Sequence, residues 1–246
     1  MIAVEVCVDT LAGLHVAAAA GVARIELCSA LDLGGLTPSF GLMQAASQLA
    51  IPVHAMIRPR AGNFVFEQRE IALMIADVKA ARDAGLQGVV LGALDGVHGL
   101  DRDGLAAIIA HCSGLGLTLH RAVDLVSDQS CALEIAVDLG FDRILTSGGA
   151  PTALRGARRI AELVDQARGR ISIMPGSGVT ADNLAAIVAG TAVSEVHASC
   201  RSRSPEPDGE GVALGFGSSA LRTDPELIAA LMSASNHLSA CLGGNS

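Results

Sequence analysis

The sequence contains no tryptophan and no tyrosine, and only five phenylalanines in 246 residues. Proteins that bind single-stranded nucleic acid stack bases on aromatic rings, so this scarcity argues against such a function. The net charge of −8, from 17 Lys and Arg against 25 Asp and Glu, also disfavours a nucleic-acid partner, which requires a basic surface. A ligand site in this chain must therefore be lined mainly by aliphatic and polar groups.

Long apolar runs and paired cysteines are also missing. Half of the chain is apolar, yet no apolar run approaches the ~20 residues that span a bilayer. The first residues show no basic region followed by an apolar stretch, so we expect no signal peptide. None of the six cysteines forms a CxxC pair, and without a secretion signal they are expected to be reduced thiols. We therefore expect a cytoplasmic protein with no membrane partner.

Short β-branched segments alternate along the chain with longer segments rich in Ala and Leu. We predict strands over residues 3–8, 24–28, 53–57, 88–92, 117–121, 143–147, 170–174 and 195–199. Their starts are spaced by roughly 20 to 35 residues, which is the size of a βα unit. Eight such units in one chain of this length predict a (β/α)₈ TIM barrel, a single domain over residues 1–246. An open parallel sheet is less suitable, because its strands are apolar on both faces and these are half polar.

Several residues mark the boundaries of helices. Gly85 is suited to end a helix, and Pro225 to occupy a first helical position. The predicted N-caps are Ser127, Asp128, Thr180 and Asp224. Residues 201–223 are rich in Gly, Ser and Pro, which predicts a long flexible loop, and a last helix is expected over about 224–240.

Two of the predicted strands turn a carboxylate and a thiol to the same side. In AVEVCVD (3–9), Glu5, Cys7 and Asp9 share one face while valines fill the other. RIELCS (24–29) places Glu26 and Cys28 in the same way. Active sites of TIM barrels lie at the C-terminal ends of the strands. We therefore expect these side chains to face the barrel interior near its mouth.

The two cysteines suggest a site for a soft metal ion. Adjacent strands lie ~4.8 Å apart, so Cys7 and Cys28 can approach each other, with Met56 or His54 on the next strand. Thiolate and thioether ligands select Cu(I). The alternative is that both thiols are simply packed, since cysteine is among the most buried residues.

Other residues at the strand ends suggest an anion site. The turn formed by Gly176, Ser177 and Gly178 leads into a predicted helix, whose N-terminus favours an anion. Arg58, Arg60 and Arg121 can hold a carboxylate or phosphate through paired hydrogen bonds. The alternative for the glycines is a plain tight turn.

Acid–base chemistry is also possible at the mouth. Glu26, His120 and Asp124 are the candidate catalytic residues, with Glu5 and His197 nearby on other strands. The alternative is a buried ion-pair network in which Glu5 or Glu26 pairs with Arg58 or Arg121, although burying many charges is costly.

Seven segments of the chain resemble the CutC family, the so-called copper homeostasis proteins. They are EVCVDT, RIELCSALDLGGLTPS, HAMIRPRAGNFVF, HRAVD, RILTSGG, RISIMPGSGV and EVHAS, and they cover about residues 2–202 in order. The resemblance implies a TIM barrel, a cytoplasmic protein, a homo-oligomer (dimer or tetramer) and copper as the ligand. No organic cofactor is expected.

The sequence also departs from the family pattern. Where the family usually has SEGG, residues 32–35 read DLGG, and its usual GGDF-Y reads GNFVF over residues 62–66. Val123 replaces a phenylalanine and Ser177 a glycine. These changes make the mouth less acidic and less aromatic but leave both cysteines intact. Two functions follow: binding of Cu(I), or an isomerase, lyase or hydrolase acting on a small anionic or phosphorylated metabolite.

Overall fold

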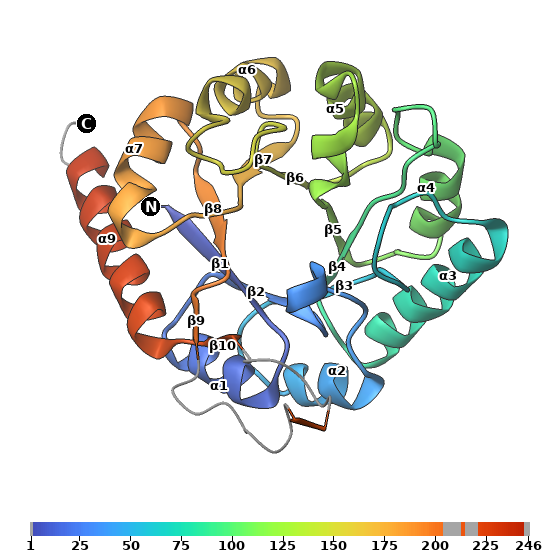
Figure 1. The fold of residues 1–246 in the computed structure, drawn as a ribbon, viewed down its shortest axis with the longest axis horizontal. Helices are drawn as coiled ribbons and strands as arrows, with labels where there is room; N and C mark the ends of the chain where they lie inside the picture. The colour runs from blue at the N-terminus through green and yellow to red at the C-terminus, as the bar shows by residue number, and fades with distance from the viewer. Residues whose placement is uncertain (1, 204–212, 215–220, 244–246) are drawn as a thin grey trace.

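The computed structural model describes residues 2–203, 213–214 and 221–243, and eight parallel strands form a barrel at its centre (Figure 1). The strands are β1 (Ala3–Val8), β2 (Arg24–Leu27), β3 (Val53–Met56), β4 (Gly88–Leu91), β5 (Gly116–Leu119), β6 (Arg143–Thr146), β7 (Ser172–Pro175) and β8 (Glu195–Ala198). Their order is β7-β6-β5-β4-β3-β2-β1-β8, and contacts between β7 and β8 bring the ends together. The predicted TIM barrel is confirmed.

Helices surround the barrel on its outside (Figure 1). They are α1 (Leu11–Ala19), α2 (Phe40–Ala46), α3 (Gln68–Asp83), α4 (Arg102–Ile109), α5 (Gln129–Asp138), α6 (Ala157–Ala167), α7 (Ala181–Thr191) and α9 (Pro225–Gly243), with short 3₁₀ helices η1 (Leu31–Leu33) and η2 (Arg121–Leu125). Among the described residues, no helix has the length and apolar character needed to cross a membrane.

Strand alternation separates an apolar outer layer from a polar interior. Val4, Val6 and Val8 of β1 are buried in the main hydrophobic core. The intervening Glu5 and Cys7 are equally buried but contact polar groups inside the barrel. The short period of the strand therefore delivers the polar residues to the barrel axis.

Most of the predicted helix signals are confirmed. The Asp128 side chain accepts from two backbone N–H groups at the start of α5, and Thr180 forms a capping box at the start of α7. Asp224 accepts from the backbone N–H groups of the first turn of α9. Ser127 was wrongly predicted as an N-cap, because its hydroxyl donates to the carbonyl of His98 instead.

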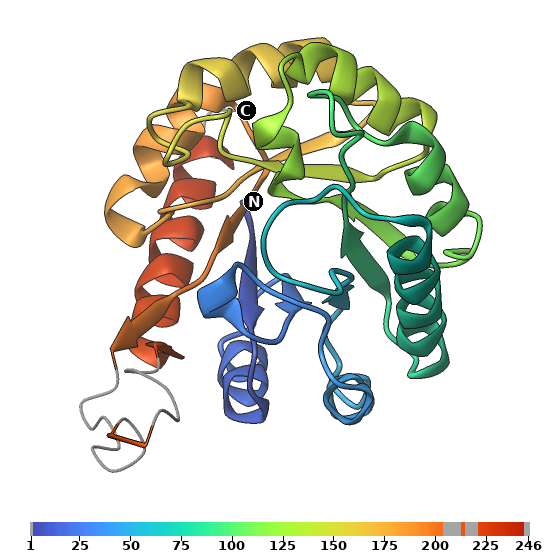
Figure 2. The same cartoon turned by 45° about the vertical axis from the view of Figure 1, so that its right-hand side comes forward.

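The C-terminal segment differs in part from the expected loop. β9 (Arg201–Arg203) and β10 (Leu221–Thr223) pair antiparallel at the two ends of the predicted loop. β10 contacts α1, and both short strands lie beside one end of α9 (Figure 2). The predicted loop therefore begins and ends with a short strand that its composition did not predict. The flexibility expected between these strands concerns residues that, apart from 213–214, lie outside the described ranges. The expected last helix is α9, which packs on α7 and β1.

Candidate functional site

A cavity of about 790 Å³ lies at the C-terminal mouth of the barrel. Polar residues from the ends of β1, β2, β5 and β8 line it, and Leu227 and Leu231 of α9 form part of its apolar wall. The position agrees with the general location of active sites in this fold. The predicted site residues can therefore be judged by whether they reach this cavity.

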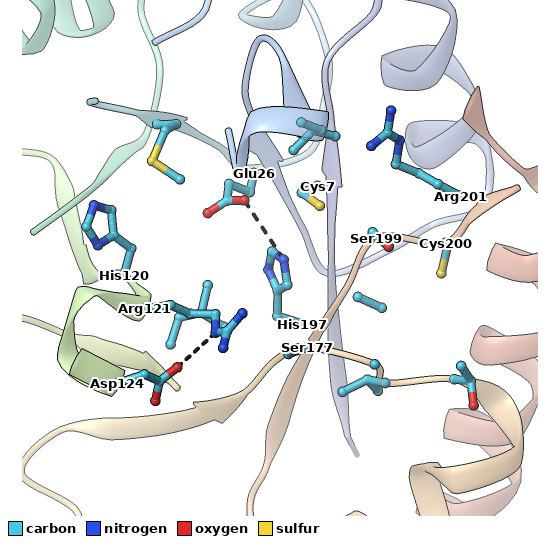
Figure 3. A pocket seen from close by; sticks show the side chains of 18 of the residues that line it. Cys7, Glu26, His120, Arg121, Asp124, Ser177, His197, Ser199, Cys200 and Arg201 are labelled. Carbon is cyan, nitrogen blue, oxygen red and sulfur yellow. Dashed lines mark hydrogen bonds and ion pairs between the residues drawn. The ribbon is translucent and has the colours of Figure 1, made fainter. Parts of the chain in front are cut away.

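Three of the lining residues converge from three adjacent strands. Cys7 of β1, Glu26 of β2 and His197 of β8 are all buried, and their ligand atoms lie within 4.8 Å of one another. The Nε2 atom of His197 is 3.9 Å from Oε2 of Glu26. Figure 3 shows these side chains pointing toward one another.

Glu5 lies beneath this group and connects it to the interior of the barrel. Its Oε1 atom is 2.7 Å from Nδ1 of His197, and its other oxygen pairs with Arg24. Arg24 also donates to Glu195 at 2.7 Å. A buried ion-pair network is present, but the partner of Glu5 is Arg24 rather than the predicted Arg58 or Arg121, because Arg24 shares the strand register of Glu5.

Burial and neighbouring charges shift the ionisation of this group. Burial alone would raise the pKa of Glu5, but the hydrogen bond with His197 and the charge of Arg24 outweigh it and hold that pKa at about 2. Burial also opposes a charge on His197, yet the neighbouring Glu26 and Glu5 raise the pKa of His197 well above its usual value. Burial raises the pKa of Cys7 and of Glu26. Glu5 is thus the persistent anion of the group.

Cys28 lies next to this group but behind the cavity wall. Its side chain is fully buried, with Sγ 3.5 Å from Oε2 of Glu26, and it packs against Met56. Met56 lines the cavity whereas Cys28 does not. Burial raises the pKa of Cys28 well above its usual value. The structure therefore brings Cys7 and Cys28 close to Glu26, with Met56 packed against Cys28.

His54 does not join them, although it was predicted beside the cysteines. Its ring packs against Gly88 and Gly116 inside the barrel and does not line the cavity. A Cβ at Gly88 would lie only 2.5 Å from this ring, so the glycines make the room that His54 fills. Burial lowers the pKa of His54 to about 4.

Two of the predicted anion-binding arginines are occupied by the protein itself. Arg58 lines the cavity, but its terminal nitrogens donate to the carbonyls of Leu33, Gly35 and Gly62. Arg60 lies outside the cavity, where it pairs with Glu70. Arg58 therefore holds the loops after β2 and β3 together, and Arg60 is not brought to the mouth.

His120 faces the cavity from the opposite side. Its Nδ1 accepts from the backbone N–H of Ala122, and its ring lies 4.9 Å from that of Phe64. Its Nε2 is buried and has no hydrogen-bond partner among the described residues. Burial lowers the pKa of His120 to about 4, so this ring is neutral at neutral pH.

Asp124 organises the loops next to His120. It accepts from the Thr146 hydroxyl at 2.5 Å, from the backbone N–H groups of Ser147 and Gly149, and from Arg121 at 2.8 Å. Arg121 also donates to the Ser147 hydroxyl, and its partly exposed guanidinium lines the cavity (Figure 3). Asp124 thus positions Arg121 and is itself saturated with donors.

The Gly176–Gly178 turn forms another part of the wall. Ser177 and Gly178 line the cavity and both have positive φ, of 79° and 71°. Gly176 lies behind them, where a Cβ would meet Leu145 at 2.5 Å. The Ser177 hydroxyl donates to the carbonyl of Pro151. The turn is therefore close-packed, with its second half exposed to the cavity.

His197 lies with Cys7 and Glu26, a grouping that the sequence alone did not indicate. It was expected among the acid–base candidates, but not in the predicted set of metal ligands. The only sequence signal was its position on the last strand, which closes the barrel next to β1. In a barrel the first and last strands are neighbours, so EVHAS and EVCVD contribute to one site.

The fold and this mouth define a TIM-barrel protein with a thiol-, imidazole- and carboxylate-lined cavity. The CutC family model matches residues 2–202. The chain belongs to the CutC family.

Individual relatives agree with this assignment. A family protein CutC from Rhizobium meliloti (strain 1021) is 52% identical over 231 residues, which is 94% of each chain. Another from Sinorhizobium medicae is 50% identical over 240 residues, covering 97% of this chain and 98% of the relative. A crystal structure from Streptococcus agalactiae, named there a copper homeostasis protein CutC, is 36% identical with a TM-score of 0.78, covering 81% of this chain and 99% of that one.

Proposed function

We propose that this protein binds Cu(I) at the C-terminal mouth of its barrel and takes part in copper homeostasis in the cytoplasm. The observation that carries the proposal is the gathering of soft ligands around Glu26. Cys28 is 3.5 Å from its carboxylate, Cys7 is within 4.8 Å of it, and Met56 packs against Cys28. Two thiols and a thioether favour Cu(I) over hard cations.

Access and redox state support the same function. Cys7 and Met56 line the cavity, so an ion can reach them from solvent. All six cysteines are free thiols, which a reducing compartment maintains. Copper is then a cargo that the mouth accepts and releases. The name of the Streptococcus agalactiae structure is consistent with this function.

An anaerobic titration of the reduced protein with Cu(I), against a competing chelator, tests the proposal. We expect tight one-to-one binding that is lost when Cys7→Ser and Cys28→Ser are combined. The matched control is Cys131→Ser with Cys241→Ser, because these exposed thiols include a Cys241–His237 pair that could bind copper adventitiously. Binding that survives the first pair and disappears in the second would refute the proposal.

The size of the cavity favours a second candidate function, catalysis on a small anionic metabolite. About 790 Å³ is far more than one ion requires and is typical of a small-molecule site. In this function Arg121, positioned by Asp124, binds the anion beside Ser177 and Gly178, while His120 and Glu26 move protons. The reaction would be an isomerisation, a lyase reaction or a hydrolysis.

A screen of phosphorylated and carboxylated metabolites tests the second candidate. We expect a ligand to raise the thermal midpoint of the wild type and to fail with Arg121→Ala. The control is Arg60→Ala, which removes an arginine that lies outside the cavity. If no metabolite discriminates between these two variants, the catalytic candidate is abandoned.

A further inference from the structure

We infer that Cys7, Glu26 and His197 form a three-ligand site for a borderline divalent cation of the Zn²⁺ class, with a fourth position open to the mouth cavity. The site shares Cys7 with the proposed copper site but does not depend on it. It uses the imidazole and carboxylate of the group where Cu(I) would use the second thiol and the thioether.

The first argument is the orientation of His197. Its Nδ1 lies 2.7 Å from Glu5, whose carboxylate also holds Arg24. Since Glu5 can only accept, Nδ1 carries a proton, and it is Nε2 that faces Glu26 and Cys7. A cation bound there would displace the proton of Nε2 and take its lone pair. A carboxylate that fixes the tautomer of a histidine through its other nitrogen is the usual second shell of a zinc ligand.

The second argument is distance. Ligand atoms bound tetrahedrally to zinc at about 2.0–2.3 Å lie about 3.3–3.6 Å apart. In this group Nε2 of His197 is 3.9 Å from Glu26, and all three ligand atoms fit within 4.8 Å. Side-chain rotations that move the ligand atoms by about one ångström would therefore be enough to reach tetrahedral spacing. The three residues are held on hydrogen-bonded neighbouring strands, β8, β1 and β2, which limits larger movements.

The third argument is an unsatisfied atom. Oε1 of Glu26 is buried and, among the described residues, no donor reaches it. A buried carboxylate oxygen without a partner is costly, and a bound cation would remove that cost. Because the residue also lines the cavity, the ion would be reachable from solvent.

The ligand types select the class of ion. One thiol, one imidazole and one carboxylate suit Zn²⁺ and its analogue Co²⁺, whereas Mg²⁺ and Ca²⁺ require oxygen ligands alone. Three protein ligands with an open position are typical of zinc sites that bind a further group, because structural zinc sites have four. The cavity beside the ion supplies room for that group.

Co²⁺ titration of the reduced protein tests the site. With no Trp or Tyr in the chain, a thiolate-to-cobalt band in the near ultraviolet would stand free of aromatic absorption. We expect that band and intense tetrahedral visible bands at one equivalent, with displacement by Zn²⁺. His197→Gln and Glu26→Gln should each weaken binding more than about 100-fold, beyond the effect expected of a second-shell residue. Cys131→Ser, on α5, should change nothing. Urea unfolding of each variant verifies that it folds.

X-ray absorption of the Zn²⁺-loaded wild type gives a readout that needs no variant. One sulfur with nitrogen and oxygen ligands is expected. Two sulfurs, or binding indifferent to His197→Gln, would overturn the inference and leave the group as a hydrogen-bonded cluster.

The same variants separate this site from the copper site. His197→Gln should lose Co²⁺ and keep Cu(I), whereas Cys28→Ser should weaken Cu(I) and keep the cobalt band. If the wild type binds Co²⁺ but not Cu(I), only the copper proposal is refuted. If it binds Cu(I) but not Co²⁺, only the divalent site is refuted.

Discussion

The two sides of the barrel mouth differ in how their charged side chains are paired and in how far they are exposed. On the closed side, formed by β8, β1 and β2, Glu5 is 1% exposed and is fully engaged with Arg24 and His197. On the open side, formed by the loops after β5 and β6, Asp124 collects donors from several loops but leaves the guanidinium of Arg121 partly exposed in the cavity. On the closed side Glu5, Arg24 and His197 satisfy one another's charges, whereas the open side presents a charge outward.

This difference separates two kinds of candidate site residue. Closed-side groups stand on hydrogen-bonded neighbouring strands and lie close together, which suits an ion that needs fixed ligands. Open-side groups keep free donors beside about 790 Å³ of space, which suits a molecule that must enter and leave. The comparison predicts that mutations on the closed side act mainly on stability and ion binding, and mutations on the open side mainly on binding of a small molecule.

Removing Glu5 should produce the largest effect. Glu5→Gln leaves Arg24 and His197 buried without their shared anion, and breaking a buried pair in this way costs about 3–5 kcal/mol. Urea unfolding measures the loss. The control is Glu134→Gln, which breaks an exposed pair with Arg170 and should have little effect. Equal effects of the two changes would show that the closed side is not a cooperative network.

Acidification should distinguish the two sides by their pH windows. The pKa of His120, lowered by burial to about 4, means that the unfolded state binds more protons between about pH 6.5 and 4. Stability that is complete above pH 6.5 is therefore lost as the pH falls, by about 2–3 kcal/mol at pH 4.5 for a fully buried histidine. The stabilisation from Glu5, whose pKa is held at about 2, is lost only below about pH 4.5.

Urea unfolding between pH 7 and pH 4.5, for the wild type and His120→Gln, measures this effect. The variant should show a flatter pH dependence, with the difference between the two proteins shrinking toward low pH. A difference that stays constant over this range would mean that His120 does not titrate as a buried neutral ring.

The fold could be predicted from the sequence because the eight alternating strands each carry their own signal. The polar face of EVCVD, for example, identifies Glu5 and Cys7 as interior residues without any tertiary information. Most caps were predictable for the same reason: Asp128 and Thr180 act on backbone groups within their own first turn. Features that depend only on residues close together in the sequence can therefore be predicted from it.

The neighbours across the barrel could not be predicted in the same way. Which interior residues lie at one level depends on the stagger of the strands, and this property belongs to the closed barrel. His54 is in register with Glu26, yet its ring turns toward Gly88 and Gly116 because those glycines leave space. Arg58 was predicted to bind an anion from its residue type and its position at a strand end, but its guanidinium donates to carbonyls of the adjoining loops instead.

Truncation of Asp124 should have an intermediate effect. Asp124→Ala leaves the backbone N–H groups of Ser147 and Gly149 and the Thr146 hydroxyl without their acceptor, at a cost of about 2 kcal/mol. Asp124→Asn keeps one acceptor oxygen and should cost about half as much. Both are measured by urea unfolding. An equal loss in both variants would mean that the charge, rather than the accepted hydrogen bonds, holds the loops.

Arg121→Ala should have the smallest effect on stability and sharpens the comparison most directly. The side chain is 42% exposed, and its pair with Asp124 is screened by solvent, so the expected change is within about 0.5 kcal/mol. The same truncation at Arg24, which is 11% exposed and holds both Glu5 and Glu195, should cost several times more. Urea unfolding of the two variants side by side tests this asymmetry. If Arg121→Ala lowered the free energy of unfolding as much as Arg24→Ala, Arg121 would be a residue that stabilises the fold, and its proposed role in binding a ligand would be refuted.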